Sequence, residues 1–165
     1  MLQKKICMLG SFSVGKTSLV RRFVESMFSE AYLTTVGVKI DKKVMRAGEQ
    51  EVTLMLWDIY GEDEFQKLRT SYLRGAAGYL FVADGTRPAT LEKVLRIRQE
   101  AEQALGVVPC VLALNKCDLT EQWEVEPEKE AELAAAGWSV LRTSAKSGEG
   151  VEEAFHQLAR RMLGI

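Results

Sequence analysis

A short glycine-containing loop near the start of the chain carries a lysine and a threonine in a spacing that suits phosphate. Residues 10–17 read GSFSVGKT and directly follow the apolar run ICML. Such a loop turns its backbone N–H groups toward an anion, and glycine tolerates the dihedral angles that this requires. Lys16 would then reach the β- and γ-phosphates, and the Thr17 hydroxyl would bind Mg²⁺. The pattern predicts a nucleotide phosphate site rather than an ordinary turn.

An aspartate after a later apolar run can complete a magnesium site. Asp58 follows LMLW, and Gly61 comes three positions later, which gives the spacing DxxG. Doubly wound sheets bind ligands beyond the carboxyl ends of their strands. An aspartate there can hold Mg²⁺ through hydration water, and the glycine lets a backbone N–H approach the γ-phosphate. DxxG is weak alone and gains force from the strand and phosphate loop that precede it.

Two more polar motifs follow predicted strands. NKCD at 115–118 follows the strand near 107–114, and SAK at 144–146 follows the strand near 138–143. In this order after a GxxxxGKT loop, they resemble the guanine-recognition motifs of Ras-superfamily small GTPases. The resemblance covers essentially the whole chain and is Rab-like in its detail. It implies a GTP/GDP switch that hydrolyses GTP with Mg²⁺.

The resemblance also implies how guanine is recognised. The Asp118 carboxylate would accept from the guanine N1–H and exocyclic amine, which adenine cannot offer in that geometry. Asn115 would bond to the base or to a loop, Lys116 would stack its aliphatic stem on the base, and Ala145 would donate its backbone N–H to the guanine carbonyl.

Two segments resemble the switches of Rab proteins. In the first, at 28–38, Thr35 matches the threonine that binds Mg²⁺ and senses the γ-phosphate, and Phe28 matches an aromatic residue that packs against the base. The second spans 58–74. The resemblance implies that effectors, an exchange factor and an activating protein bind through these switches.

Together these inferences define a predicted site. The predicted catalytic residues are Lys16, Thr35, Gly61 and Glu62. The predicted Mg²⁺ ligands are Thr17, Thr35 and, through water, Asp58. The predicted contacts to GTP or GDP are Ser11, Phe12, Ser13, Val14, Gly15, Lys16, Thr17, Ser18, Phe28, Tyr32, Thr35, Gly61, Asn115, Lys116, Asp118, Leu119, Ser144, Ala145 and Lys146.

Two residues of the predicted site depart from the family pattern. Glu62 stands where most small GTPases have a glutamine that orients the attacking water, and an ionised glutamate accepts from water but cannot donate to phosphate. Phe12 stands where the family has a small residue, so its ring would crowd position 62 and the arginine that an activating partner supplies. Such an arginine typically accelerates hydrolysis by roughly 10³–10⁵. We therefore expect slow intrinsic hydrolysis. The alternative is that both side chains point away from the nucleotide and change nothing.

Two other functions stay open at this point. A guanine-nucleotide-binding signalling or scaffold module with negligible hydrolysis would carry the same motifs and the same departures. A nucleoside or adenylate-type kinase would share the phosphate loop, but NKCD at 115–118 argues against it.

The elements that must position these residues alternate along the chain. This predicts an α/β P-loop NTPase fold, a six-stranded mostly parallel sheet with helices on both faces. A short turn with glycine at 47–50 makes one edge an antiparallel hairpin. Strands are expected near 4–9, 38–46, 51–57, 78–84, 107–114 and 138–143. Helical patterns follow the phosphate loop and cover 86–106, 127–137 and 151–162.

Composition fits one small-GTPase domain over residues 1–165. The formal net charge of -1 gives no general attraction to nucleic acid or to an anionic membrane. We expect no signal peptide and no membrane-spanning run, and Cys7, Cys110 and Cys117 resemble reduced core residues. Residues 160–165 contain no cysteine for prenylation. We expect a cytoplasmic monomer with no direct membrane anchor, unless a longer protein continues beyond residue 165.

Overall fold

A six-stranded sheet forms the centre of the computed structural model, which describes residues 2–11, 13–25, 38–59 and 70–165. The strands are β1 (Gln3–Leu9), β2 (Val38–Ala47), β3 (Gln50–Ile59), β4 (Gly78–Asp84), β5 (Cys110–Asn115) and β6 (Val140–Arg142). The helices are α1 (Lys16–Glu25), α2 (Pro88–Leu105), α3 (Pro127–Ala135) and α4 (Val151–Leu163), with short 3-10 turns η1 (Thr70–Leu73) and η2 (Thr120–Gln122).

The strand order is β2-β3-β1-β4-β5-β6. Only β2 and β3 pair antiparallel, through the hairpin at 47–50, and every other neighbouring pair is parallel. The predicted fold, including its one antiparallel edge, is confirmed. The parallel strands β4 and β5 are buried along their whole length. Their continuous apolar sequence reflects helices on both sides, because neither face meets water.

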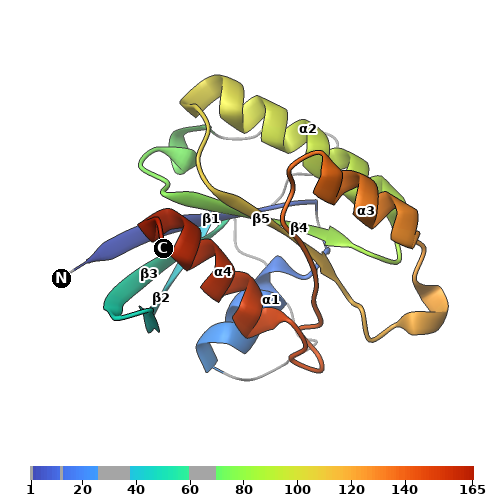
Figure 1. Ribbon diagram of the computed structural model, residues 1–165, viewed down its shortest axis with the longest axis horizontal. Coiled ribbons are helices and arrows are strands. Elements are labelled where there is room, and N and C mark those ends of the chain that lie inside the picture. Colours follow the sequence, from blue (N-terminus) through green and yellow to red (C-terminus); the bar gives the residue numbers. More distant parts are fainter. Residues whose placement is uncertain (1, 12, 26–37, 60–69) are drawn as a thin grey trace.

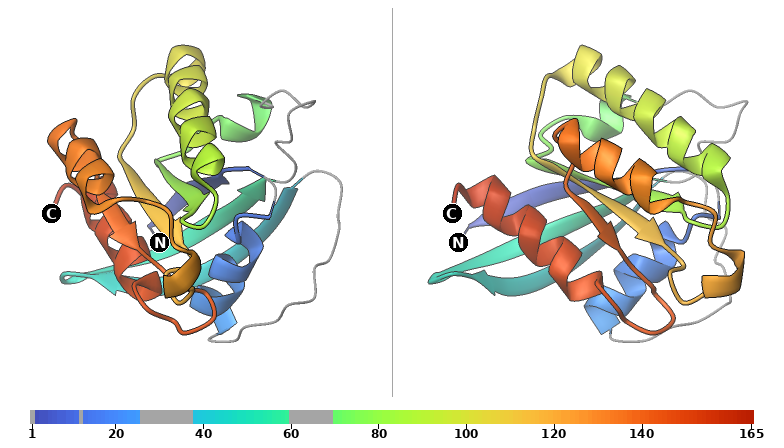
Figure 2. Two further views of the ribbon diagram at one scale, coloured as in Figure 1. Left: turned by 90° about the vertical axis from the view of Figure 1, so that its right-hand side faces the viewer. Right: turned by 45° about the vertical axis from the view of Figure 1, so that its right-hand side comes forward.

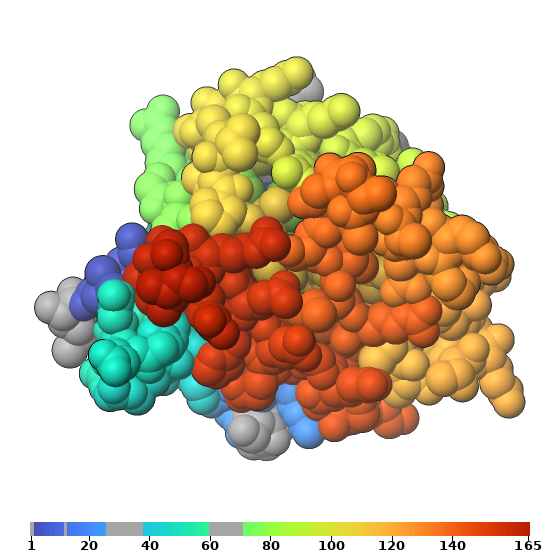
Figure 3. All heavy atoms as spheres, in the orientation of Figure 1, coloured from blue at the N-terminus to red at the C-terminus, as the bar shows by residue number. Residues whose placement is uncertain are grey.

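Helices cover the two faces of the sheet in pairs (Figure 1). One face packs against α1 and α4, where the rings of Phe23 and Phe155 stack with centroids 4.1 Å apart. The opposite face packs against α2 and α3, and there Phe81 meets the edge of Trp138. In space-filling view α4 and the segment before it lie across the front of the molecule (Figure 3). The sheet is therefore held rigidly between two apolar layers.

The fifth strand is shorter than predicted at its start. It begins at Cys110 rather than near residue 107, and Val107 is 76% exposed. Pro109 has no N–H to donate to a strand ladder, although its carbonyl accepts from the Tyr79 N–H at 3.0 Å. Val107 is therefore part of the connection that follows α2, despite its β-branched side chain.

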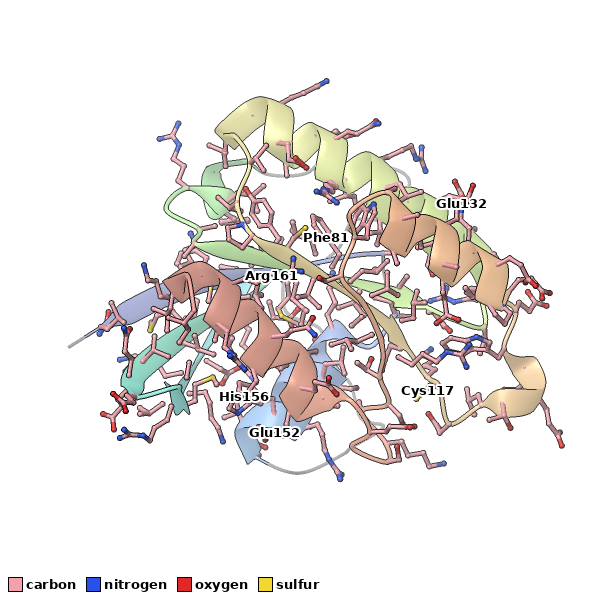
Figure 4. All side chains as sticks on the ribbon, viewed as in Figure 1. Phe81, Cys117, Glu132, Glu152, His156 and Arg161 are labelled. Carbon is pink, nitrogen blue, oxygen red and sulfur yellow. The ribbon has the colours of Figure 1, made fainter. Side chains whose placement is uncertain are left out.

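The three cysteines were expected to be reduced core residues. Cys7 and Cys110 are buried, as predicted, whereas Cys117 is only partly buried and donates its thiol proton to Glu149 Oε2 at 3.1 Å. The expectation that Cys117 belongs to the core is therefore wrong, because it follows the end of β5 rather than lying within it. His156 lies on α4 beside Glu152, and its side chain is 44% exposed (Figure 4).

The carboxyl ends of the parallel strands come together at one edge of the sheet, which faces the viewer in the left view of Figure 2. The loops that carry the predicted motifs leave the sheet there, after β1, β3, β5 and β6. Both termini lie toward the opposite side of the molecule (Figure 1). Within the described ranges, no helix has the length and apolar character needed to cross a membrane.

Candidate nucleotide-binding site

The phosphate loop connects the end of β1 to the first residue of α1. Gly15 has φ +102°, and a Cβ there would collide with the Asn115 side-chain amide. Glycine is needed here both for the dihedral angle and for the close approach. Since α1 begins at Lys16, the backbone N–H groups of its first turn point toward the loop. The loop and the positive end of the helix together form a cradle suited to an anion.

Lys16 is buried at the base of this loop and is 7% exposed. Its Nζ donates to the carbonyl oxygens of Gly10 and Ile59, each at 2.9 Å. The ammonium group therefore lies between the ends of β1 and β3, where the predicted phosphate and magnesium sites meet. A buried positive charge at this position favours an anionic ligand.

Thr17 and Asp58 fit a divalent cation. The Thr17 hydroxyl donates to Asp58 Oδ2 at 2.5 Å, while Asp58 Oδ1 is buried with no hydrogen-bond partner among the described residues. Burial raises the pKa of Asp58, and the Lys16 charge and the Thr17 hydrogen bond oppose that rise. A buried carboxylate oxygen without a partner is costly, and hard oxygen ligands suit Mg²⁺. The donor set matches the ion that the sequence implies.

The NKCD motif bonds directly to the phosphate loop. Asn115, the last residue of β5, donates its amide to the Val14 carbonyl at 2.9 Å and accepts from the Thr143 hydroxyl at 3.1 Å. Lys116 Nζ donates to the Ser13 carbonyl at 3.1 Å. For Asn115, the sequence left open a bond to the base or to a loop, and the structure shows a bond to the loop. The base-side and phosphate-side motifs thus form one connected unit.

The exposed carboxylate of Asp118 is bonded to the SAK loop. The Ser144 hydroxyl donates to Asp118 Oδ1 at 2.7 Å, and Ala145 beside it is 3% exposed. This bond fixes Asp118 next to the backbone of the SAK loop. The arrangement gives an acceptor that is open to solvent and fixed in direction, which suits recognition of N–H groups on a ligand.

Arg22 of α1 holds the next residues of the SAK loop. Its guanidinium donates to the carbonyls of Lys146 at 3.5 Å and Ser147 at 3.2 Å. Cys117 of the NKCD motif bonds to Glu149 in the same loop, and burial together with that bond raises the pKa of its thiol to about 12. A thiol with so high a pKa stays protonated at neutral pH and is a poor nucleophile.

The structure therefore brings most of the predicted site together at one edge of the sheet. The predicted residues that it describes are Ser11, Ser13, Val14, Gly15, Lys16, Thr17, Ser18, Asp58, Asn115, Lys116, Asp118, Leu119, Ser144, Ala145 and Lys146. The predicted residues that lie outside the described part of the chain are Phe12, Phe28, Tyr32, Thr35, Gly61 and Glu62.

Two residues that bind these loops were missed from the sequence. Asp84 pairs with Lys116 Nζ at 2.9 Å, and Arg22 holds the SAK loop. Asp84 had a usable signal, because it ends a buried strand just as Asp58 nearly does. Arg22 had none, since a basic residue in the last turn of a helix is common.

Comparison with known proteins gives a consistent result over the whole chain. A family model described as Ras family matches residues 5–164. Human Ras-related protein Rab-8B is 34% identical over 161 residues, which cover 96% of this chain and 78% of the relative. Ras-related protein Rab-13 of Canis lupus familiaris is also 34% identical, and Ras-related protein Rab-8 of Diplobatis ommata is 35% identical, each over 96% of this chain and 79% and 77% of the relative.

Proposed function

The chain belongs to the Ras family and is a GTP-binding switch GTPase, and we propose that it hydrolyses GTP slowly in the absence of an activating partner. Family membership removes the nucleoside kinase alternative. The observation that supports the nucleotide site most strongly is the cluster of Lys16, Thr17 and Asp58, in which one buried carboxylate oxygen has no hydrogen-bond partner among the residues that the structure describes.

At the phosphate end, Lys16 would exchange its carbonyl partners for phosphate oxygens and stabilise the negative charge that develops during hydrolysis. Thr17 and Thr35 would bind Mg²⁺ directly, and Asp58 would hold it through water. When bound, Mg²⁺ neutralises charge on the β- and γ-phosphates. Gly61 would donate its backbone N–H to the γ-phosphate and so couple the second switch to the presence of that phosphate.

At the base end, Asp118 would accept from the N1–H and exocyclic amine of guanine. Ala145 would donate its backbone N–H to the guanine carbonyl, and Lys116 would cover one face of the base with its stem. The hydrogen bonds of Asn115 and Lys116 to the phosphate loop support this assignment, because they set the base end and the phosphate end at a fixed separation.

Slow hydrolysis follows from Glu62 and Phe12. An ionised carboxylate at position 62 would be repelled by the γ-phosphate and has no hydrogen to donate to it. The aromatic ring at position 12 would occupy space that the water-orienting residue and a partner's arginine need.

Replacing these two residues tests the proposal. In single-turnover assays of the purified, GTP-loaded chain, Glu62→Gln should speed phosphate release by about tenfold or more, a modest part of what a positioned catalytic group supplies. Phe12→Gly should give a smaller increase by itself and a larger one with an activating protein present. Glu128→Gln on α3 makes the same charge change away from the site and should leave the rate unaltered.

The proposal would be contradicted if the wild-type chain hydrolysed GTP as fast as Rab-8B and neither substitution accelerated hydrolysis. Phosphate release that stays undetectable in all variants would instead favour a switch that depends on a partner for its chemistry.

Partners would bind through the switches at 28–38 and 58–74. Effectors, an exchange factor and an activating protein are the expected classes, because relatives of this family use them in general. We propose that the chain is a cytoplasmic monomer.

A further inference from the structure

Asp84 is a buried carboxylate beside the nucleotide site to which the motifs give no role. It ends β4, and its side chain is 1% exposed. Four donor groups from the described residues surround it: the Thr86 N–H at 2.8 Å, the Thr86 hydroxyl at 2.7 Å, Arg87 Nε at 3.0 Å and Lys116 Nζ at 2.9 Å. Three of these four donors belong to the next few residues of the chain, and the fourth, Lys116, follows the end of β5.

The Lys116 ammonium connects Asp84 to the phosphate loop. The same Nζ that pairs with Asp84 also donates to the Ser13 carbonyl at 3.1 Å. A continuous chain of polar contacts thus runs from the end of β4, through the NKCD motif, to the phosphate loop. Asp84 is not among the predicted nucleotide contacts, so it would act through Lys116.

Backbone strain is concentrated at the two ends of this bridge. Ser13 has φ +61° and Lys116 has φ +71°, and they are the residues other than glycine with positive φ in the described ranges. Residues other than glycine avoid positive φ, and they adopt it only where the surrounding structure holds them there. The Lys116 to Ser13 hydrogen bond joins the two strained residues, and Asp84 fixes the donor of that bond.

The Asp84 carboxylate is ionised in this setting. Burial alone would raise its pKa, but the hydrogen bonds from Lys116, Thr86 and Arg87 outweigh burial and lower it. It therefore presents a full negative charge to the Lys116 ammonium near neutral pH, and the two charges compensate each other in a region with little water.

We propose that Asp84 is a positioning residue for nucleotide retention: by holding Lys116 against the Ser13 carbonyl, it keeps the base loop and the phosphate loop in register and slows release of GDP. The proposal rests on the guanine-nucleotide site described above. The competing explanation is that Asp84 only orders the turn before α2, through Thr86 and Arg87, without effect on the ligand.

A double-mutant cycle in the full chain separates these roles. The variants are Asp84→Asn, Lys116→Met and the double variant, and the readout is the dissociation rate of a fluorescent GDP analogue in excess Mg²⁺. Asp84→Asn should release the analogue about tenfold faster or more, the loss typical of one hydrogen bond to a charged group. Lys116→Met keeps the aliphatic stem that covers the base and should show a similar acceleration, with the turn contacts of Asp84 left in place.

Non-additivity is the decisive result. If Asp84 acts through Lys116, the double variant should release the analogue little faster than either single variant. Rates that multiply would show that the two residues act separately, and the proposal would be wrong. Should Asp84→Asn fail to fold, unchanged release from Lys116→Met overturns the proposal by itself.

Arg87→Gln is the matched control. It removes a donor to Asp84 from a side chain that is 46% exposed, but leaves the Lys116 contact in place. It should change the release rate by less than about twofold, as expected for an exposed ion pair. If Arg87→Gln accelerates release as much as Asp84→Asn does, the effect belongs to the turn before α2 and the proposal is wrong.

The same assay separates this proposal from the guanine-nucleotide site on which it rests. A wild-type chain that binds no GDP analogue would contradict the guanine-nucleotide site. Wild-type binding with unchanged release from Asp84→Asn would contradict only the role of Asp84.

Discussion

Asp118→Asn should turn a guanine-specific chain into one that prefers xanthine nucleotide. An asparagine amide cannot accept from both N–H groups of guanine, yet it can donate to the 2-oxo group of xanthine. Two hydrogen bonds to a charged acceptor contribute about 3–6 kcal/mol together, so GDP affinity should fall roughly 10²-fold or more. Competition of labelled GDP by unlabelled GDP and XDP measures both changes.

Glu100→Gln on α2 is a suitable control, because it makes the same carboxylate-to-amide change at an exposed residue away from the base loops. It should leave both affinities unchanged. An Asp118→Asn variant that retains wild-type affinity for GDP, or that gains affinity for ADP rather than XDP, would remove the assignment of Asp118 to the base.

Lys16→Met should nearly abolish binding of GTP and GDP. Methionine is of similar length and apolar, so it fills the space but supplies no charge to the phosphates. Losing charge-assisted hydrogen bonds to two phosphate oxygens should weaken binding by roughly 10²-fold or more. The change also leaves the Gly10 and Ile59 carbonyls without this donor, which should destabilise the nucleotide-free protein by about 1–3 kcal/mol.

Calorimetric titration with GDP and thermal unfolding without nucleotide separate these two effects. Lys129→Met on α3 removes a lysine that pairs with Glu132 at the surface and should change neither quantity appreciably. If Lys16→Met lowers unfolding stability but binds GDP as tightly as wild type, Lys16 is a structural residue and not a phosphate ligand.

The fold and much of the site were predictable because local patterns agreed with one another. β4 and β5 are continuous apolar runs, the pattern of parallel strands covered on both faces, and the hairpin at 47–50 marks the antiparallel edge. A loop between the end of such a strand and the start of a helix has few geometries, so the placement of Lys16 and Thr17 followed from the motif alone.

Contacts between segments distant in sequence were not predictable. Asp84 and Lys116 are separated by more than a helix and a strand, and their pairing depends on the parallel register of β4 and β5, in which Asp84 lies opposite Asn115. Cys117 was expected in the core because it lies beside a predicted buried strand, but β5 ends two residues earlier and the Cys117 side chain is only partly buried. Single-residue errors of this kind arise at strand ends, where the periodic signal stops.

Identifying the nucleotide that copurifies with the chain tests the central claim most directly. Protein purified in Mg²⁺ buffer without added nucleotide is denatured, and the released material is separated by ion-exchange chromatography. A guanine-nucleotide site with slow hydrolysis predicts guanine nucleotide in stoichiometric amount, with an appreciable share still present as GTP. Adenine nucleotide, or none at all from a folded chain, would contradict it.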